Sequence, residues 1–130
     1  MLPVIELAAP NLEQRPNAVD LIASNSATYA FILGAPVAAP WHDTITRPDL
    51  DQVAIRLLQE NDMLHADQAG SIMQGQWQAF SWLVNEVLRL EYPLRANHLL
   101  MTGSIGALHP GKPGDYHAKY GSLGSIDFSL

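Results

Sequence analysis

Short apolar runs, separated by segments rich in proline, asparagine and other polar residues, predict short strands in the first third of the chain. The opening "MLPVIELAA" is apolar enough for a buried strand of about five residues that contains Glu6. A loop with Pro10 and Pro16 follows, and residues 20–27 then fit a short helix or turn before a strand at 29–33. Because an unpaired carboxylate is costly to bury, a glutamate inside an apolar strand points to a specific role.

Two hairpins are predicted farther along. In residues 53–58, Val53, Ile55 and Leu57 alternate with less apolar neighbours, and turn residues at 60–62 precede a returning strand at 63–66. Residues 115–121 and 124–130 form a second strand pair around a glycine-rich turn. Between them, "HLLMTGS" at 98–104 predicts a buried strand that runs into a glycine turn.

The hydrophobic period changes to about 3.6 in "GQWQAFSWLVNEVLRLEYP", which predicts one main helix at about 76–91. Its apolar stripe is formed by Trp77, Phe80, Val84, Val87 and Leu88, and such a stripe is typical of core packing. We therefore expect a mixed α+β, β-rich fold with mostly antiparallel strands, in a single domain over residues 1–130.

Composition narrows the class of protein. The net charge of -6 leaves no basic surface for a nucleic acid, and the absence of cysteine excludes thiolate metal sites and thiol nucleophiles. The longest uncharged run, 21–41, is too polar for a membrane span, and Glu6 interrupts any signal-like apolar start. We expect a soluble, cytoplasmic protein without a membrane or nucleic-acid partner.

Common catalytic motifs give little help. The five histidines form no HExxH pattern, and the chain has neither a GxSxG elbow nor a P-loop. The strongest local candidate is Thr102, Gly103 and Ser104, because two hydroxyls and open backbone N–H groups can hold a carboxylate or carbonyl oxygen of a small ligand. The same residues also fit a tight turn capped by its hydroxyls.

The order of several segments is more informative. The hairpin "LLQENDMLHADQAGS", the helix "AFSWLVNEVL", "PLRANHLLMTGSIGALHPGKPGD" and the terminal "YGSLGSIDF" resemble the C-terminal part of the 2-oxopent-4-enoate hydratase and 4-oxalocrotonate decarboxylase group, in the fumarylacetoacetate hydrolase superfamily. The segment "PVIELAAPNLEQRPNAVDLIASNSATYAFILG" resembles the part that precedes these landmarks in the group. Together the similar segments cover nearly the whole chain. Residues 1–130 therefore resemble the C-terminal half of the catalytic domain of this group.

This resemblance implies a rolled, mostly antiparallel sheet and lyase chemistry on 2-hydroxy-2,4-dienoates or 2-oxo acids. In the group, three carboxylates bind Mg²⁺ or Mn²⁺, which chelates the substrate and stabilises an enolate. By the match, Glu6 is one metal ligand. The implied substrate-binding residues are Asp20, Asn25, Thr102, Gly103 and Ser104.

The chain departs from the group at its catalytic centre. The Glu-x-Glu motif that supplies two metal ligands is absent, and Arg15 and Asn17 stand where the group has a lysine. Arginine cannot replace a lysine that must lose its proton. The resemblance therefore leaves three hypotheses: a lyase whose Mg²⁺ or Mn²⁺ site is completed by another chain, a non-catalytic binding or oligomerising relative, and a metal-independent isomerase or cyclase that uses the same pocket.

The missing upstream strands also bear on assembly. Removing them from such a domain exposes sheet edges and apolar faces that proteins normally cover. We expect a homo-oligomer or a complex with a longer homologue.

Overall fold

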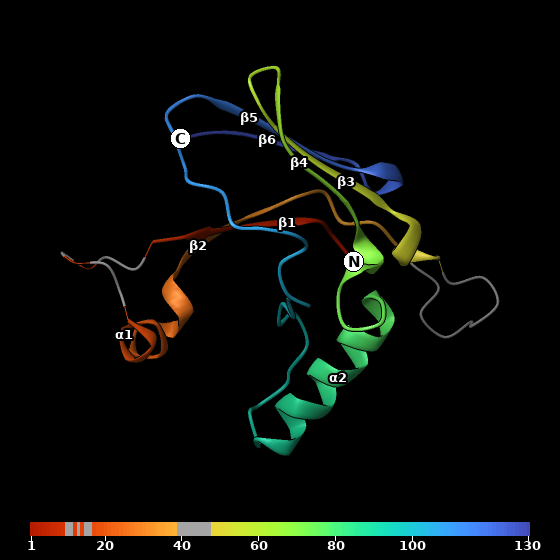
Figure 1. Ribbon diagram of the computed structural model, residues 1–130. Helices are drawn as coiled ribbons and strands as arrows, with labels where there is room; N and C mark the ends of the chain where they lie inside the picture. The colour runs from red at the N-terminus through yellow and green to blue at the C-terminus, as the bar shows by residue number, and fades with distance from the viewer. Residues whose placement is uncertain (10–11, 13, 15–16, 39–47) are drawn as a thin grey trace.

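The computed structural model describes residues 1–9, 12, 14, 17–38 and 48–130. Strands predominate over helices, and all pairings are antiparallel (Figure 1). The elements are β1 (Val4–Ala8), α1 (Ala18–Ala23), β2 (Thr28–Leu33), β3 (Ala54–Gln59), β4 (Asp62–Gln68), α2 (Gln76–Arg89), β5 (Asp115–Tyr120) and β6 (Ser125–Ser129). The predicted mixed α+β, β-rich class is confirmed, although the strands form two sheets where one rolled sheet was expected.

The smaller sheet pairs β1 with β2. Ile5 lies opposite Ile32 and both pack against the core, so the alternate residues Glu6 and Phe31, also opposite each other, point outward. The prediction that Glu6 lies buried is therefore wrong: its side chain is exposed, because strand alternation places it on the side away from the core.

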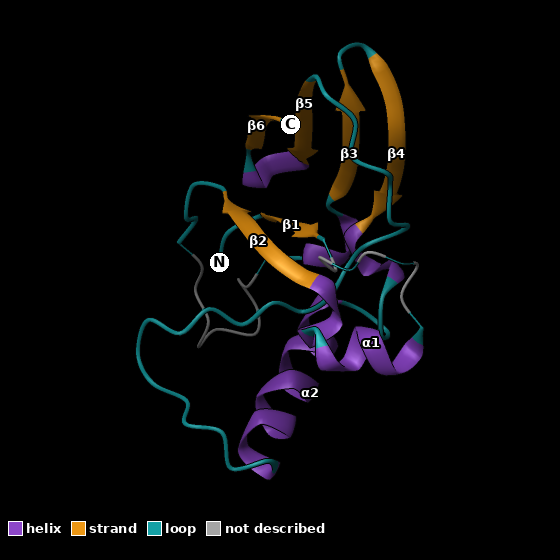
Figure 2. Ribbon diagram, turned by 90° about the vertical axis from the view of Figure 1, so that its left-hand side faces the viewer, coloured by secondary structure: helices purple, strands orange, loops and turns teal. Residues whose placement is uncertain are grey.

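The larger sheet has the strand order β4-β3-β5-β6 and lies above the β1–β2 sheet (Figures 1 and 2). Both predicted hairpins are confirmed, with β3 pairing to β4 and β5 to β6. The β3 alternation is also confirmed, since Val53 and Ile55 are buried and Arg56 is exposed. The sheet therefore presents one apolar face to the interior and one polar face to solvent.

The core lies between the two sheets. Its buried members come from both hairpins of the larger sheet and from the turn after β4: Val53, Ile55, Ala69, Ala118, Tyr120 and Ile126. Ile5 and Ile32 of the smaller sheet pack against them. Tyr120 also donates a hydrogen bond from its hydroxyl to the Val4 carbonyl oxygen, 3.1 Å away, which ties the two sheets together.

Helix α2 confirms the predicted main helix and ends two residues earlier than expected. It begins after Gly75, whose φ of 112° suits glycine, and the first turn is fixed where Asp51 Oδ1 accepts from the Gln76 N–H at 2.7 Å. Beyond this point the helix extends away from both sheets (Figure 2). Its apolar stripe is consequently less buried than core packing requires, and Leu88 is 57% exposed.

The predicted strand at 98–104 is wrong. Residues 93–114 contain no helix or strand, and Gly103, which lies inside the predicted segment, has a φ of 113° that a regular strand does not allow. Thr102 is held instead through its side chain, by the start of α2. In the part of the chain that the structure describes, no helix is long and apolar enough to cross a bilayer.

Candidate functional site

Glu6 is presented to solvent from the middle of β1. Thr28 lies on the same side of the β1–β2 sheet and donates from Oγ1 to Glu6 Oε1 at 2.7 Å. This hydrogen bond orients one carboxylate oxygen and lowers the freedom of the side chain. The geometry suits a carboxylate that receives a ligand from outside the sheet.

Asp20 and Asn25 come from the connection between β1 and β2. The Asp20 carboxylate closes a capping box at the start of α1, where Oδ2 accepts from the Asn17 N–H at 3.0 Å and Asn17 Oδ1 accepts from the Asp20 N–H at 3.0 Å. Asn25 is exposed and begins a run of three left-handed residues that leads into β2. The visible role of Asp20 is therefore to start α1.

A side-chain hydrogen bond connects the turn of Thr102, Gly103 and Ser104 to the first residue of α2. Thr102 Oγ1 donates to Gln76 Oε1 at 2.9 Å, and Gln76 Nε2 donates to the Ala69 carbonyl oxygen at 2.6 Å. Gly103 has a φ of 113° and a Cβ added there would meet nothing within 4 Å. The sequence was compatible with a ligand-binding turn or with a tight turn capped by its hydroxyls. The structure shows an open turn that is held through one hydroxyl, and Ser104 is exposed.

The predicted site residues therefore fall into two groups, and the hydrogen bonds of each group connect it to a different element. Glu6 belongs to the β1–β2 sheet, whereas Thr102 belongs to α2 through Gln76. Sequence analysis missed Gln76 because a glutamine at the start of a helix carries no motif, and its role depends on the path of a distant loop.

The residues present do not fit a complete site for Mg²⁺ or Mn²⁺. Such hard cations take about six oxygen ligands, and Mg²⁺ is usually held by one or two carboxylates together with several waters and substrate oxygens. Glu6 is the one carboxylate that the resemblance assigns to the metal. Among the residues that the structure describes, no three or more histidine, aspartate or glutamate side chains come together in a group that could hold an ion. Further ligands would have to come from outside this set of residues.

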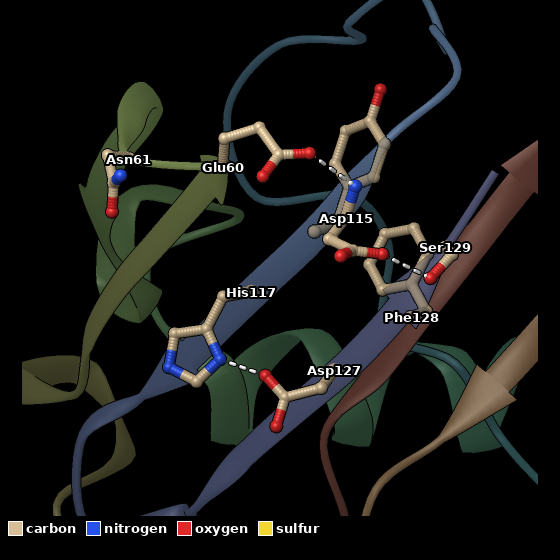
Figure 3. Close-up of a pocket in the computed structure, with 8 residues that line it drawn as sticks. Glu60, Asn61, Asp115, His117, Asp127, Phe128 and Ser129 are labelled. Atoms are coloured by element: carbon tan, nitrogen blue, oxygen red, sulfur yellow. Dashed lines mark hydrogen bonds and ion pairs between the residues drawn. The ribbon is translucent and has the colours of Figure 1, made fainter.

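A different polar group occupies the solvent face of the larger sheet (Figure 3). His117 Nδ1 contacts Asp127 Oδ1 across β5 and β6, and Ser129 Oγ donates to Asp115 Oδ1 at 2.5 Å. These residues, with Glu60, line an open hollow of about 450 Å³. Asp115 and His117 share a face because they are two residues apart on β5, and none of the predicted site residues lines this hollow.

Two other histidines meet on the core side. The rings of His65 and His109 lie 5.4 Å apart, and both Nε2 atoms are buried without a hydrogen-bond partner. His65 Nε2 is also 3.9 Å from Asp67 Oδ2. The pairing fixes the loop after the Thr102 turn against β4 and was not predictable from the isolated histidines.

Comparison with known proteins places this geometry in context. No family model matches the chain. A 2-keto-4-pentenoate hydratase of Burkholderia vietnamiensis is 30% identical over 109 residues, which are 82% of this chain and 39% of the relative. A 2-keto-4-pentenoate hydratase of Paraburkholderia phymatum is 30% identical over 113 residues, and a 2-oxo-hept-4-ene-1,7-dioate hydratase of Escherichia coli is 27% identical over 130. These alignments cover 85% and 96% of this chain, and 41% and 47% of the respective relatives.

The chain is a homologue of these hydratases. The resemblance to the hydratase group is therefore confirmed, and the chain spans less than half the length of the relatives that it matches. Hydrogen bonds hold Glu6 and the Thr102 turn of this chain in defined positions, and the described residues do not contain a complete catalytic centre.

Proposed function

We propose that this hydratase homologue contributes to a lyase site for a 2-hydroxy-2,4-dienoate or a related 2-oxo acid, and that the site is completed by a second polypeptide segment. The observation that carries the proposal is the outward-facing, oriented carboxylate of Glu6 in a chain that matches hydratases over 82% of its length. The described residues around Glu6 do not supply all the ligands and proton-transfer groups that such a reaction needs.

The roles proposed for the chain's own residues follow from their chemistry. Glu6 would act as a general acid or base that exchanges a proton with the carbon skeleton of the substrate. Alternatively, it would ligate a cation whose other ligands come from the second polypeptide segment. The exposed Ser104 hydroxyl and the open backbone at Gly103 would bind a carboxylate or keto oxygen of the substrate. Gln76 would position the turn through Thr102 without touching the substrate.

The test is ultraviolet-monitored consumption of a 2-hydroxy-2,4-dienoate by the full chain. We expect the conjugated diene absorbance to fall with the wild-type protein and at least a hundredfold more slowly with Glu6→Gln, which removes the negative charge and keeps the shape. Parallel reactions with Mg²⁺, Mn²⁺ or EDTA would report whether an added cation takes part. Equal rates for the two proteins, or no consumption by either, would contradict the proposal.

A non-catalytic relative is the second candidate. It is favoured by the use of the Asp20 carboxylate as a helix cap and by the lack of a carboxylate cluster around Glu6 in the described ranges. Such a protein would assemble with a partner but leave the dienoate absorbance unchanged, so the same assay separates the two candidates.

A further inference from the structure

The solvent face of the larger sheet places two basic side chains opposite each other. Arg56 on β3 is in register with Lys119 on β5, and Lys119 is in register with Ser125 on β6. All three residues are exposed and alternate with buried neighbours, so their side chains lie on the face away from the core. We call these three residues the cationic row, because they present two positive charges and a hydroxyl across three strands.

The two cations of this row have no counter-charge within the chain. The sequence contains only seven lysine and arginine residues and has a net charge of -6. Directly opposite residues on neighbouring strands have Cβ atoms about 5 Å apart, and like charges in that position destabilise a sheet. Among the residues that the structure describes, the side chains of Arg56 and Lys119 have no ion-pair partner. A bound anion would therefore relieve their repulsion.

The cationic row lines an open hollow of about 400 Å³ on the solvent face. Gly121 and Gly124 also line this hollow, next to Ser125. A Cβ added at Gly124 would meet nothing within 4 Å, so the space beside the Ser125 hydroxyl is open. None of the described residues that line the hollow is an aspartate or a glutamate. The space is large enough for a small anion, and its charge is positive.

His117 lies at the boundary between this hollow and the acidic hollow of Figure 3, because it lines both of them. Its Nδ1 contacts Asp127 Oδ1. Asp127 is the one carboxylate on β6, and it lines the acidic hollow together with Glu60 and Asp115. This carboxylate is consequently engaged by His117 and leaves the charge of the cationic row uncompensated.

We propose that Arg56, Lys119 and Ser125 bind a small oxyanion with two negative charges, of the phosphate or dicarboxylate type. The planar guanidinium fork of arginine matches two oxygens of such a group, and the lysine ammonium adds a point charge. The serine hydroxyl donates a further hydrogen bond. The inference goes beyond the proposed function, because Glu6 and the Thr102 turn do not line this hollow, and each proposal can fail without the other.

Nuclear magnetic resonance titrations of the full ¹⁵N-labelled chain test the proposal. Inorganic phosphate and succinate are added in separate series, with sodium chloride keeping the ionic strength constant. We expect saturable shifts of the amides of residues 56, 119 and 125 in at least one series, with a dissociation constant on the order of 1 mM. The series that saturates at the lower concentration identifies the type of oxyanion.

Charge-removing variants distinguish this site from general electrostatic attraction. Arg56→Gln and Lys119→Gln should each raise the dissociation constant at least about tenfold, because each removes a charge-assisted hydrogen bond. Lys119→Arg keeps the charge and should retain binding. Lys112→Gln is the matched control, since Lys112 is exposed, carries the same charge and does not line the hollow.

Three results would overturn the proposal: no shifts beyond those of a chloride series, shifts that never saturate, or equal weakening by Lys119→Gln and Lys112→Gln. Circular dichroism checks the fold of each variant, and Arg56→Gln alone is sufficient if Lys119→Gln does not fold. Thermal unfolding gives a second readout, because a ligand that binds only the folded state raises its melting temperature. The saturating oxyanion should do so for the wild type and not for the glutamine variants, and equal rises would contradict the site.

Discussion

The hydroxyl of Tyr120 donates a hydrogen bond to the Val4 carbonyl oxygen, 3.1 Å away, across the gap between the two sheets. Val4 begins β1 and Tyr120 ends β5, so this bond joins segments that are 116 residues apart in the chain. It positions the strand that carries Glu6 relative to the larger sheet.

Tyr120→Phe should lower the free energy of unfolding by about 1 kcal/mol, because it removes this partly buried hydrogen bond and leaves the Val4 carbonyl without its partner. Urea titration at neutral pH measures the change. Tyr29→Phe is the control, since Tyr29 is 74% exposed and its variant should unfold like the wild type. A loss of the same size in both variants would contradict the role given to Tyr120.

The same residue predicts a loss of stability in alkali. Burial raises the pKa of Tyr120 to about 12, from an ordinary value of 10.0. Because the folded-state pKa lies above the unfolded one, this contribution is present below pH 10 and is lost as the pH rises towards 12. The loss amounts to about 2 kcal/mol in the free energy of unfolding. In urea titrations from pH 9 to 12, Tyr120→Phe should show a shallower decline than the wild type, and parallel declines would contradict the assignment.

Gln76 should be important for the Thr102 turn. Gln76→Ala removes both the acceptor of Thr102 and the donor to the Ala69 carbonyl, so we expect a loss of about 1 to 2 kcal/mol in the free energy of unfolding. Gln78→Ala, at an exposed position of the same helix, is the matched control and should have little effect. Amide hydrogen exchange should also become faster around residues 102–104 in Gln76→Ala only; unchanged exchange there would show that the turn does not depend on Gln76.

Alanine substitutions at two glycines distinguish the cost of backbone strain from the cost of steric crowding. Gly75 and Gly124 both have positive φ values, 112° and 100°, but an added Cβ would lie 2.3 Å from Asp51 Oδ2 at Gly75 and would meet nothing within 4 Å at Gly124. Thermal unfolding should show that Gly124→Ala costs about 1 kcal/mol from strain alone. Gly75→Ala should cost distinctly more, because Asp51 must also release the N-terminus of α2. Equal costs would show that Asp51 moves aside freely.

Local patterns were sufficient to predict the elements whose side chains alternate at one regular period. The alternation of Val53 and Ile55 predicts β3, and the helical spacing from Trp77 predicts α2, because each period reports which side of an element is apolar. The 98–104 segment failed because its apolar residues are followed by glycines with positive φ, and sequence alone does not reveal that no regular strand forms there.

The candidate site was harder to predict for a different reason. The resemblance indicated Glu6, but not its exposure, which depends on Ile5 taking the inward position of the strand. Gln76 and the His65–His109 contact depend on how a long loop returns to the sheet, and no spacing in the sequence encodes that path.

The most direct test of the account is the rate of dienoate consumption by the full chain and by its Glu6→Gln variant. The account predicts measurable loss of the diene absorbance with the wild type, which rises with assembly and falls at least a hundredfold when the Glu6 charge is removed. No consumption by the assembled wild-type chain, or consumption that does not depend on Glu6, would contradict it.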